Sequence, residues 1–467
     1  MCGINGFSTF GGSALGGNNR ILIERMNAKI QHRGPDQDGV FLDGHVSLGH
    51  RRLSIIDLSE NGRQPLFNED KSLCLIFNGE IYNFKDLRRD LEKGGHKFYS
   101  QTDSEVILHL YENFKEDCPK FLNGIFAFAV WNIKNKELFL VRDRIGVKPL
   151  YYYHQNGKFI FSSEIKGILE HNIKREIDLE ALNHYFRLMY VPAPLTMFKN
   201  IYKLPQGHYL KLRNVGGSTS HIEIEKYWDV HDFQDIKSKN EIIEKIEELM
   251  KQSVRGQLIS DRPVGVFLSG GIDSTSVLGI ASEILSNHPS PKATGGKLKT
   301  FSVGFDIDDP SNKFNADFHL ARLTSRFYNT EHNELLVNSK DVLNNLEKVI
   351  YHMDEPIAEP TQIATFLLSK FAKKEVAVVL GGDGGDELFG GYKRYYYSYV
   401  LNKFWATKLF PFLKPKIYAK FMFQKEEEIA KILNKEINQP KITEQFFKDN
   451  YLASKGVAKA VEGRFSN

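Results

Sequence analysis

The chain has 467 residues, of which 41% are hydrophobic and 26% are charged, and its formal net charge at pH 7 is +4. This composition is typical of a folded globular protein and excludes a disordered or fibrous chain. The positive surplus is too small and too dispersed to form an electrostatic surface for nucleic acid, so we expect no nucleic-acid partner. Because a single core rarely grows beyond roughly 250–300 residues, at least two domains are expected.

The first two hundred residues are predicted to form short strands separated by turns, with helices between them. Apolar runs predict strands at residues 73–77, 125–133, 137–141, 149–153 and 158–161. The first of these ends at Asn78-Gly79, which is a turn dipeptide. Helical spacing of apolar residues predicts helices at 20–30 and 103–114. Together these elements predict an α+β domain built on antiparallel sheets.

Polar and small residues accumulate between residues 213 and 240, and the pattern changes beyond them. We therefore predict a first domain at 1–212, a linker at 213–240 and a second domain at 241–467. In the second domain, predicted strands at 264–268, 300–305 and 376–380 alternate with helices such as 241–257 and 274–285. This alternation predicts an α/β domain with a parallel, doubly wound sheet.

The cysteines and the N-terminal sequence bear on where the protein resides. Cys2, Cys74 and Cys118 form an odd, sparse set that provides no disulfide framework and suits a reducing compartment. No apolar run approaches the ~18 residues that span a bilayer. The first residues lack the charged-then-apolar order of a signal peptide. We expect a cytoplasmic protein with no membrane partner.

Cys2 is a candidate nucleophile, because removal of Met1 would place a free amine and a thiol on one residue. An α-amino group has a pKa of about 7.7–8 and can act as a general base near neutral pH. An N-terminal nucleophile can therefore use its own amine and needs no histidine partner. Taken alone, Cys-Gly at position 2 favours an incidental thiol on a frayed terminus, and the residues described next change this interpretation.

Several polar residues further along could complete a site for a free amino acid. Such a site needs a cation for the carboxylate, anions for the ammonium group and N–H donors for an oxyanion. These groups are supplied by Arg52, by Glu80 with Asp103, and by Asn78 with Gly79. For Asp103 the alternative role is a helix N-cap. Spacing alone does not bring these residues together.

Seven ordered motifs resemble the class II glutamine amidotransferase domain, an N-terminal-nucleophile fold with a four-layer αββα sandwich. The motifs are Cys2-Gly-Ile, Arg33-Gly-Pro-Asp36, Arg52-Leu-Ser-Ile, Asn78-Gly-Glu-Ile-Tyr-Asn83, Thr102-Asp-Ser-Glu105, Gly124-Ile-Phe-Ala-Phe-Ala129 and Arg142-Asp-Arg-Ile-Gly-Val-Lys-Pro-Leu-Tyr151. The resemblance implies that Cys2 attacks the γ-amide of glutamine and that Asn78 and the Gly79 N–H stabilise the oxyanion. It also implies that glutamine is bound by Arg52, Asn78, Glu80 and Asp103.

A second candidate site lies at residues 269–275, where a predicted strand meets a predicted helix. Backbone N–H groups of a glycine turn and the helix dipole form an anion cradle. The segment is not a P-loop, because no lysine follows its glycines. A carboxylate among phosphates needs a divalent cation, so Asp273 is a candidate Mg²⁺ ligand. The alternative is a tight turn with Asp and Ser as helix caps.

A second glycine cluster favours the nucleotide interpretation. Gly381-Gly-Asp-Gly-Gly-Asp-Glu387 also follows a predicted buried strand. Glycine turns at the carboxyl ends of parallel strands can line one crevice. We therefore predict that Asp386 is the second metal carboxylate.

These motifs resemble the PP-loop ATP pyrophosphatase fold, and their order behind a glutaminase resembles the glutamine-dependent asparagine synthetases. The flanking motifs agree: Tyr190-Val-Pro-Ala-Pro194, Phe301-Ser-Val-Gly-Phe305, Asp354-Glu-Pro356 and Leu388-Phe-Gly-Gly-Tyr392. The resemblance implies cleavage of ATP between the α and β phosphates, with Mg²⁺ on Asp273 and Asp386. Either Asp354 or Glu355 is a candidate acceptor-site residue. The residues implied to bind ATP are Leu268, Ser269, Gly270, Gly271, Asp273, Ser274, Val303, Gly381 and Gly382.

Three departures from this family pattern are present. Gly381 stands where the family usually has Ser, and Gln206 stands where it usually has Pro. The third is that a basic Arg-x-Lys-x-x-Phe element, whose lysine helps to hold phosphates, is missing after Tyr392. We therefore expect a C-terminally shortened synthetase domain: either the chain is a truncated product, or another lysine substitutes, or the synthetase half is impaired.

The expected function is that of an ATP-dependent carbon–nitrogen ligase that takes nitrogen from glutamine. Aspartate is the default acceptor, and an enclosed passage should carry ammonia between the sites. One alternative is the same chemistry on another carboxylate, such as a uronic acid of a surface polysaccharide. Another is a shortened, non-synthesising paralogue that acts as a regulator. Amidotransferases of sugar phosphates or phosphoribosyl pyrophosphate lack Ser-Gly-Gly-Ile-Asp-Ser and are disfavoured. A homodimer would fit the family.

Overall fold

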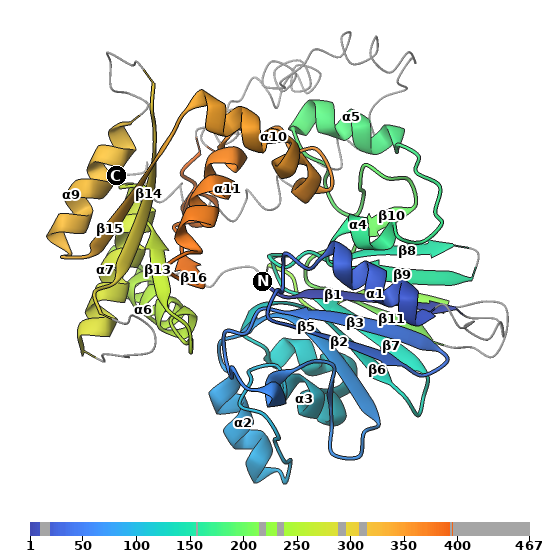
Figure 1. The fold of residues 1–467 in the computed structure, drawn as a ribbon. Helices are drawn as coiled ribbons and strands as arrows, with labels where there is room; N and C mark the ends of the chain where they lie inside the picture. The colour runs from blue at the N-terminus through green and yellow to red at the C-terminus, as the bar shows by residue number, and fades with distance from the viewer. Residues whose placement is uncertain are drawn as a thin grey trace, which may run out of the picture.

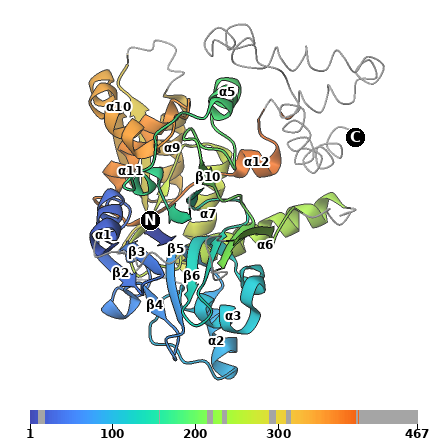
Figure 2. The ribbon, with the colours of Figure 1, turned by 90° about the vertical axis from the view of Figure 1, so that its right-hand side faces the viewer.

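The structure is a computed structural model that describes residues 1–9, 19–155, 157–213, 221–230, 238–287, 296–307, 315–392 and 395. It contains a β-rich N-terminal domain and a C-terminal domain with a parallel sheet, which lie next to each other (Figures 1 and 2). The predicted shortening of the second domain concerns residues 396–467, which lie outside the described residues.

The N-terminal domain contains two six-stranded sheets, in the orders β10-β8-β9-β1-β3-β2 and β12-β11-β7-β6-β5-β4. The strands are β1 (Gly3–Thr9), β2 (Gln37–Leu42), β3 (Val46–Arg52), β4 (Leu66–Phe67), β5 (Leu73–Ile81), β6 (Gly124–Asn132), β7 (Glu137–Arg142), β8 (Tyr151–Gln155), β9 (Lys158–Ser162), β10 (Ile201–Lys203), β11 (His208–Arg213) and β12 (His221–Lys226). The helices are α1 (Asn19–Lys29), α2 (Phe84–Lys93), α3 (Val106–Phe114), α4 (Ile165–Ile168) and α5 (Leu179–Leu188), with 3-10 turns η1 (Glu60–Gly62) and η2 (Lys115–Phe121).

Three apolar layers hold this domain together. One lies between the two sheets, a second lies between the second sheet and α3, and a third lies between the first sheet and helices α1 and α4. The order helix, sheet, sheet, helix is the four-layer αββα sandwich, so this prediction is confirmed (Figure 1).

Strand β5 shows why the sequences of the central strands are continuous apolar runs. Leu73, Leu75 and Phe77 point to the helix-covered face, whereas Cys74 and Ile76 point to the layer between the sheets. A strand that is buried on both faces needs apolar residues at every position. The prediction of a turn at Asn78-Gly79 is wrong, because β5 continues to Ile81 and both residues pair with β6.

The predicted linker at 213–240 differs from the structure in its middle. Strand β12 lies within it and pairs antiparallel with β11, and Tyr227 joins the core under α3. The charged sequence His-Ile-Glu-Ile-Glu indicates a linker by its polarity, but an edge strand readily carries such charges. The N-terminal domain therefore continues beyond the predicted boundary at 212.

The C-terminal domain is built on a four-stranded parallel sheet in the order β15-β14-β13-β16. Helices α6 and α7 pack on one face and α11 packs on the other, which confirms the predicted doubly wound sheet. The elements are α6 (Lys239–Gln257), β13 (Val264–Phe267), α7 (Ile272–Asn287), β14 (Lys299–Phe305), α9 (Ala316–Phe327), β15 (Glu331–Val337), α10 (Ser339–Met353), α11 (Thr361–Ala372), β16 (Val378–Leu380) and α12 (Gly385–Phe389).

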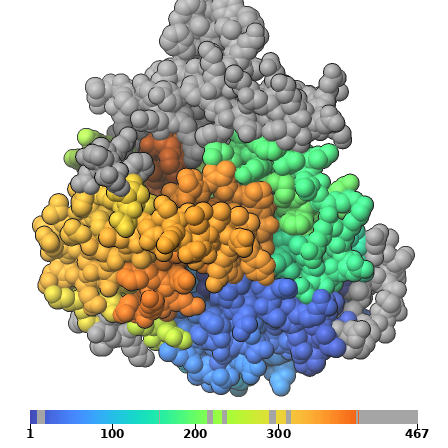
Figure 3. Space-filling model, turned by 45° about the horizontal axis from the view of Figure 1, so that its top comes forward, coloured from blue at the N-terminus to red at the C-terminus, as the bar shows by residue number. Residues whose placement is uncertain are grey.

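The two domains are in direct contact. In the space-filling view, the orange residues of the C-terminal domain lie against the blue and green surface of the N-terminal domain (Figure 3). Arg262 of the segment between α6 and β13 forms an ion pair with Asp36 at 3.1 Å and donates to the carbonyl of Ser54. At the end of α10, the ring of His352 lies 4.4 Å from that of His32. Among the described helices, none combines the length and the hydropathy needed to cross a bilayer.

Candidate active sites

Cys2 lines a narrow pocket of the N-terminal domain. The pocket brings together Cys2, Arg52, Gly79, Glu80 and Asp103, five of the residues that the sequence assigns to glutamine. The remaining lining residues are Leu53, Ile55, Ile56, Gln64, Phe77, Thr102 and Ser104. Residues that are up to about a hundred positions apart therefore form one site, because the start of β1 and the ends of β3 and β5 lie at the same side of the two sheets.

Cys2 sits directly before β1, and two backbone contacts fix its position. The Leu53 N–H points at the Cys2 Sγ atom at 3.4 Å, and the Arg33 Nε donates to the Cys2 carbonyl at 2.9 Å. Burial raises the pKa of the Cys2 thiol, so a nearby base is needed to form the thiolate. Burial also lowers the pKa of the Met1 amine to about 5. The Met1 amine is therefore mostly neutral at pH 7.

Asn78 and Gly79 lie where β5 passes β6. A Cβ atom on Gly79 would stand 2.3 Å from the Ile125 carbonyl oxygen, so only glycine allows this approach of the two strands. The Asn78 side chain is fully buried, and its Nδ2 and Oδ1 atoms have no hydrogen-bond partner within the described part of the chain. A buried amide without a partner is costly, and an oxyanion would supply the missing acceptor.

Arg52 provides the cation of the pocket. It lies at the end of β3. Its guanidinium donates to the carbonyls of Ile56 at 3.1 Å and Asp57 at 2.6 Å, and to Oε1 of Gln37 at 2.7 Å. These neutral acceptors fix the orientation of the guanidinium and leave its charge available to a substrate carboxylate.

Glu80 and Asp103 provide the negative charge. Burial raises the pKa of Asp103 to about 6. Burial and the charge of Asp103 raise the pKa of Glu80 well above its usual range. The Asp103 carboxylate accepts the Ile81 N–H at 2.7 Å, which ties it to β5, and its predicted alternative as the N-cap of α3 is wrong because α3 begins at Val106. The negative charge of these two acids suits a ligand with an ammonium group.

Two charged residues near Cys2 were not assigned a role from the sequence. Lys148 is buried, and its pKa is lowered by burial against the opposing effect of Glu80. Arg33 holds the Cys2 carbonyl and reaches Glu164 at 3.0 Å. Both lie inside motifs that carried the family resemblance, and those motifs were the signal that could have identified them.

The glycine turn after β13 lies at the carboxyl edge of the parallel sheet, beside the turn after β16. The hydroxyls of Ser269 and Ser274 are 2.9 Å apart, and the Gly271 N–H donates to the Ser269 hydroxyl at 3.2 Å. Because β13 pairs with both β14 and β16, the segments that follow these strands share one edge. Leu268 is buried behind the turn, and Val303 lies on the neighbouring β14.

The two glycine clusters touch each other, which is the geometry that a nucleotide crevice needs. A Cβ atom on Gly382 would stand 2.7 Å from the Ser274 nitrogen, and one on Gly385 would stand 2.5 Å from Cγ of Asp273. Asp386 follows Gly385 directly, so both candidate metal carboxylates belong to this contact region. Oxygen ligands of this kind suit Mg²⁺, so the residues present fit a Mg²⁺–nucleotide group.

The candidate acceptor-site acids contact the N-terminal domain. Asp354 forms an ion pair with Lys166 at 2.7 Å, and Glu355 forms one with Lys203. Burial raises the pKa of both carboxyl groups. A role for either acid in proton transfer stays a prediction.

The fold and the two sites define a two-domain protein in which an N-terminal-nucleophile sandwich precedes a parallel-sheet domain of the nucleotide-binding kind. Two family models match it: the glutamine amidotransferase domain over residues 1–228 and asparagine synthase over residues 245–461. The chain belongs to the glutamine-hydrolysing asparagine synthetase family, whose members use ATP.

Individual relatives agree with this assignment. The chain is 39% identical to asparagine synthetase [glutamine-hydrolyzing] 1 of Bacillus subtilis over 85% of its own length and 59% of the relative's. It is 37% identical to a putative asparagine synthetase of Methanocaldococcus jannaschii over 89% of its own length and 79% of the relative's. Among solved structures, a glutamine phosphoribosylpyrophosphate amidotransferase from Bacillus subtilis matches with a TM-score of 0.36 and 15% identity, over 65% of this chain and 75% of that one. The chain thus spans less than two thirds of the Bacillus synthetase.

Proposed function

We propose that this protein releases ammonia from glutamine at Cys2 and transfers it to a carboxylate that ATP has activated, with aspartate as the acceptor and asparagine as the product. The observation that supports the proposal is the composition of the Cys2 pocket, where a thiol, the Arg52 cation and the acids Glu80 and Asp103 line one small space. A free amino acid presents a carboxylate and an ammonium group, which match these charges, and its side-chain amide would then face the thiol.

The first half-reaction follows from the groups around Cys2. After removal of Met1, the Cys2 amine takes the thiol proton, directly or through water, and Sγ attacks the γ-amide carbon. The amide oxygen becomes an oxyanion beside the Asn78 amide and the Gly79 N–H. The amine returns the proton to the nitrogen, which leaves as ammonia, and water hydrolyses the thioester to give glutamate.

The second half-reaction uses the crevice of the C-terminal domain. We assign the binding of ATP to Leu268, Val303 and the two glycine turns, and the binding of Mg²⁺ to Asp273 and Asp386. ATP bound there would supply the adenylyl group that activates the acceptor carboxylate, with release of pyrophosphate, and AMP would leave when ammonia attacks. The hydroxyls of Ser269 and Ser274 and the Gly271 N–H orient the phosphates.

The test separates the two halves. Cys2→Ala should abolish glutamine hydrolysis and leave amidation with added ammonium salt intact, whereas Asp273→Asn should abolish pyrophosphate release and spare glutamine hydrolysis. Pyrophosphate release is then measured with a panel of carboxylates that includes aspartate and a uronic acid. Pyrophosphate release with aspartate supports the proposal. Release with the uronic acid alone would show that the acceptor is a uronic acid and not aspartate. If no carboxylate elicits pyrophosphate while glutamine hydrolysis persists, a regulatory paralogue is the better account.

A further inference from the structure

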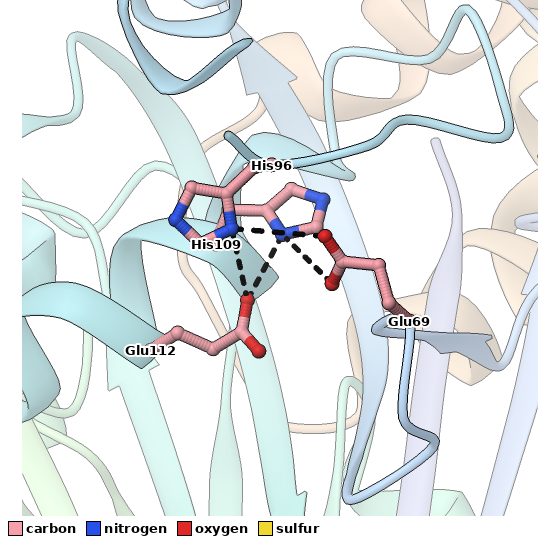
Figure 4. A group of neighbouring side chains, drawn as sticks. All are labelled: Glu69, His96, His109 and Glu112. Atoms are coloured by element: carbon pink, nitrogen blue, oxygen red, sulfur yellow. Dashed lines mark hydrogen bonds and ion pairs between the residues drawn. The ribbon is translucent and has the colours of Figure 1, made fainter. Parts of the chain in front are cut away.

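Four metal-ligating side chains of the N-terminal domain converge on one point, and none of them lines the Cys2 pocket (Figure 4). Glu69 lies in the turn between β4 and β5, His96 lies in the loop after α2, and His109 and Glu112 lie on α3. The spacing of three residues puts the last two on one face of the helix. One nitrogen or oxygen atom of each residue lies within 4.8 Å of those of the others.

The distances among these atoms resemble those around a tetrahedral metal ion. Metal–ligand distances of about 2.0–2.1 Å place neighbouring ligands of a tetrahedron about 3.3 Å apart. The Nδ1 atom of His109 lies 3.0 Å from Glu112 and 3.6 Å from Glu69, and the Nδ1 atom of His96 lies 3.4 Å from Glu112 and 3.8 Å from Glu69. Both imidazoles therefore present the same nitrogen to both carboxylates (Figure 4).

Hydrogen bonds around the cluster hold His96 and the two carboxylates in this orientation. Nε2 of His96 lies 3.2 Å from the Asn113 side-chain oxygen, which can only accept a hydrogen bond. A hydrogen bond there is donated by a protonated Nε2, and in a neutral ring this tautomer leaves the lone pair of Nδ1 directed at the two carboxylates. The Nδ1 lone pair and the two carboxylates repel one another. A cation placed between them would be bound by all three groups.

The carboxylates are also held from outside. The second oxygen of Glu112 accepts the Asn68 amide at 2.7 Å, and Glu69 accepts the Lys97 N–H at 2.9 Å. Metal-ligating carboxylates and histidines usually have such outer partners. The His109 side chain is fully buried, so the cluster is shielded from water on that side.

We propose that Glu69, His96, His109 and Glu112 form a structural site for a divalent transition metal, with zinc as the best fit. Two imidazoles and two carboxylates provide four nitrogen and oxygen ligands, which is the number that a tetrahedral zinc ion takes. Calcium and magnesium prefer oxygen ligands throughout and fit this set less well.

The site would fasten the segment that carries Asp103. The loop that follows His96 leads through Ser100, whose backbone N–H donates to Glu105 at 2.8 Å, and on to Asp103 in the Cys2 pocket. A metal ion that joins this loop to α3 and to the β4–β5 turn stabilises the N-terminal domain without taking part in its chemistry. This inference does not depend on the proposed function.

The experiment uses the full, untagged chain after dialysis against EDTA and measures zinc uptake by isothermal titration and by elemental analysis. We expect about one zinc ion per chain and a higher thermal midpoint of unfolding in the presence of zinc. Replacement of zinc by Co²⁺ should give the intense visible absorption of tetrahedral Co²⁺.

Two conservative variants test the ligands. His96→Gln and Glu112→Gln avoid the fully buried His109, and circular dichroism checks that each variant folds. Each should bind zinc at least about 100-fold more weakly, since loss even of an outer partner commonly costs 10–100-fold. The matched control is His208→Gln on β11, outside the cluster, which should bind zinc as the wild type does. The proposal is overturned if the wild type takes up no stoichiometric zinc, or if either ligand variant keeps wild-type affinity.

Discussion

Lys166 and Asp354 form a buried ion pair that joins the two domains. The Lys166 Nζ atom lies 2.7 Å from the Asp354 carboxylate, and the two side chains are only 8% and 6% exposed. The second oxygen of Asp354 accepts the Ile165 N–H at 2.7 Å. Charges removed from water are stable only when each has a partner, so this contact fixes how the end of α10 meets α4.

The pair continues toward the nucleophile. Lys166 also contacts Glu164, and Arg33 bridges Glu164 at 3.0 Å and the carbonyl of Cys2 at 2.9 Å. An unbroken series of charged hydrogen bonds therefore connects the residue after α10 to the backbone of the cysteine. Such a series physically connects the two proposed sites. The energetic coupling between the two sites can be measured with variants of these residues.

The first prediction concerns the strength of this interdomain pair. Lys166→Met removes the ammonium group and leaves the Asp354 carboxylate buried without its cation. Loss of one partner of a buried pair commonly costs about 3–5 kcal/mol. We expect a decrease of this size in the free energy of unfolding, measured by guanidinium titration followed by circular dichroism.

The matched control is the exposed pair of Lys134 and Asp70. Their atoms also lie 2.7 Å apart, but the side chains are 70% and 54% exposed. Lys134→Met should change the free energy of unfolding by less than about 1 kcal/mol, because water solvates the remaining carboxylate. Equal effects of the two variants would show that Lys166 and Asp354 are not buried together in solution.

The second prediction concerns stability in acid. Burial opposes ionisation of Glu164, but the hydrogen bond from His32 and the charges of Arg33 and Lys166 outweigh it and lower the pKa of Glu164 to about 2. A carboxyl group with a lowered pKa stabilises the folded state above its ordinary pKa, and this contribution is lost as the pH falls toward 2. The wild type should therefore lose about 3 kcal/mol from this group between about pH 5 and pH 2.

Glu164→Gln provides the comparison. The variant should be less stable at pH 7, and its free energy of unfolding should fall less steeply than that of the wild type below pH 5. Urea titrations at a series of pH values measure both curves. Parallel curves for the two proteins would contradict the assignment of a strongly lowered pKa to Glu164.

Periodicity predicted most of the fold because the buried elements carry strong patterns. Strands β5, β6 and β13 are apolar on both faces, and their positions agree with the structure to within a few residues. The errors fell where tertiary pairing overrides local preference. Asn78-Gly79 would form a turn in isolation, yet β6 lies beside it and supplies backbone partners. The charged sequence of β12 predicts a linker, and only its pairing with β11 in the folded chain makes it a strand.

The candidate sites were predictable only through motifs, since sequence spacing does not encode which strand ends meet. Arg52 and Asp103 are distant along the chain, and their approach depends on the way β3 and β5 sit in separate sheets. The cluster around His109 was not predicted at all. Its four ligands come from three segments whose spacing matches no metal-binding motif, and only the folded chain brings them together.

The third prediction concerns the pH dependence of glutamine use. Burial raises the pKa of Asp103 to about 6, so its carboxylate is lost as the pH falls through this value. The protonated acid no longer attracts the ammonium group of glutamine. We expect the KM for glutamine to be constant above pH 7 and to rise as the pH falls below about 6, in initial-rate measurements of glutaminase activity.

Asp103→Asn tests the origin of this profile, because the amide can keep the bond to the Ile81 N–H but carries no charge. Loss of a charged hydrogen bond of about 1.5–3 kcal/mol should raise the KM about 10- to 100-fold at pH 8 and flatten its pH dependence. If the KM of the variant still rose in the same way as the pH falls below about 6, the group that titrates would not be Asp103.

The fourth prediction concerns the contact between the two glycine turns. Gly382→Ala places a Cβ atom 2.7 Å from the Ser274 nitrogen and 2.9 Å from Cβ of Asp273. Because the nearest atom belongs to the backbone, the clash is relieved only by moving one turn away from the other. We expect pyrophosphate formation from ATP to fall at least tenfold, measured by a coupled pyrophosphate assay.

The glutaminase activity of the same variant is the internal control. Gly382 lies in the C-terminal domain, and Cys2 and its pocket do not contact it. Basal glutamine hydrolysis without ATP should therefore stay within about twofold of the wild type, and equal loss of both activities would indicate general unfolding. Full retention of pyrophosphate formation would show that the two turns do not form the nucleotide crevice, since no arrangement of the turns as they stand leaves room for the added methyl group.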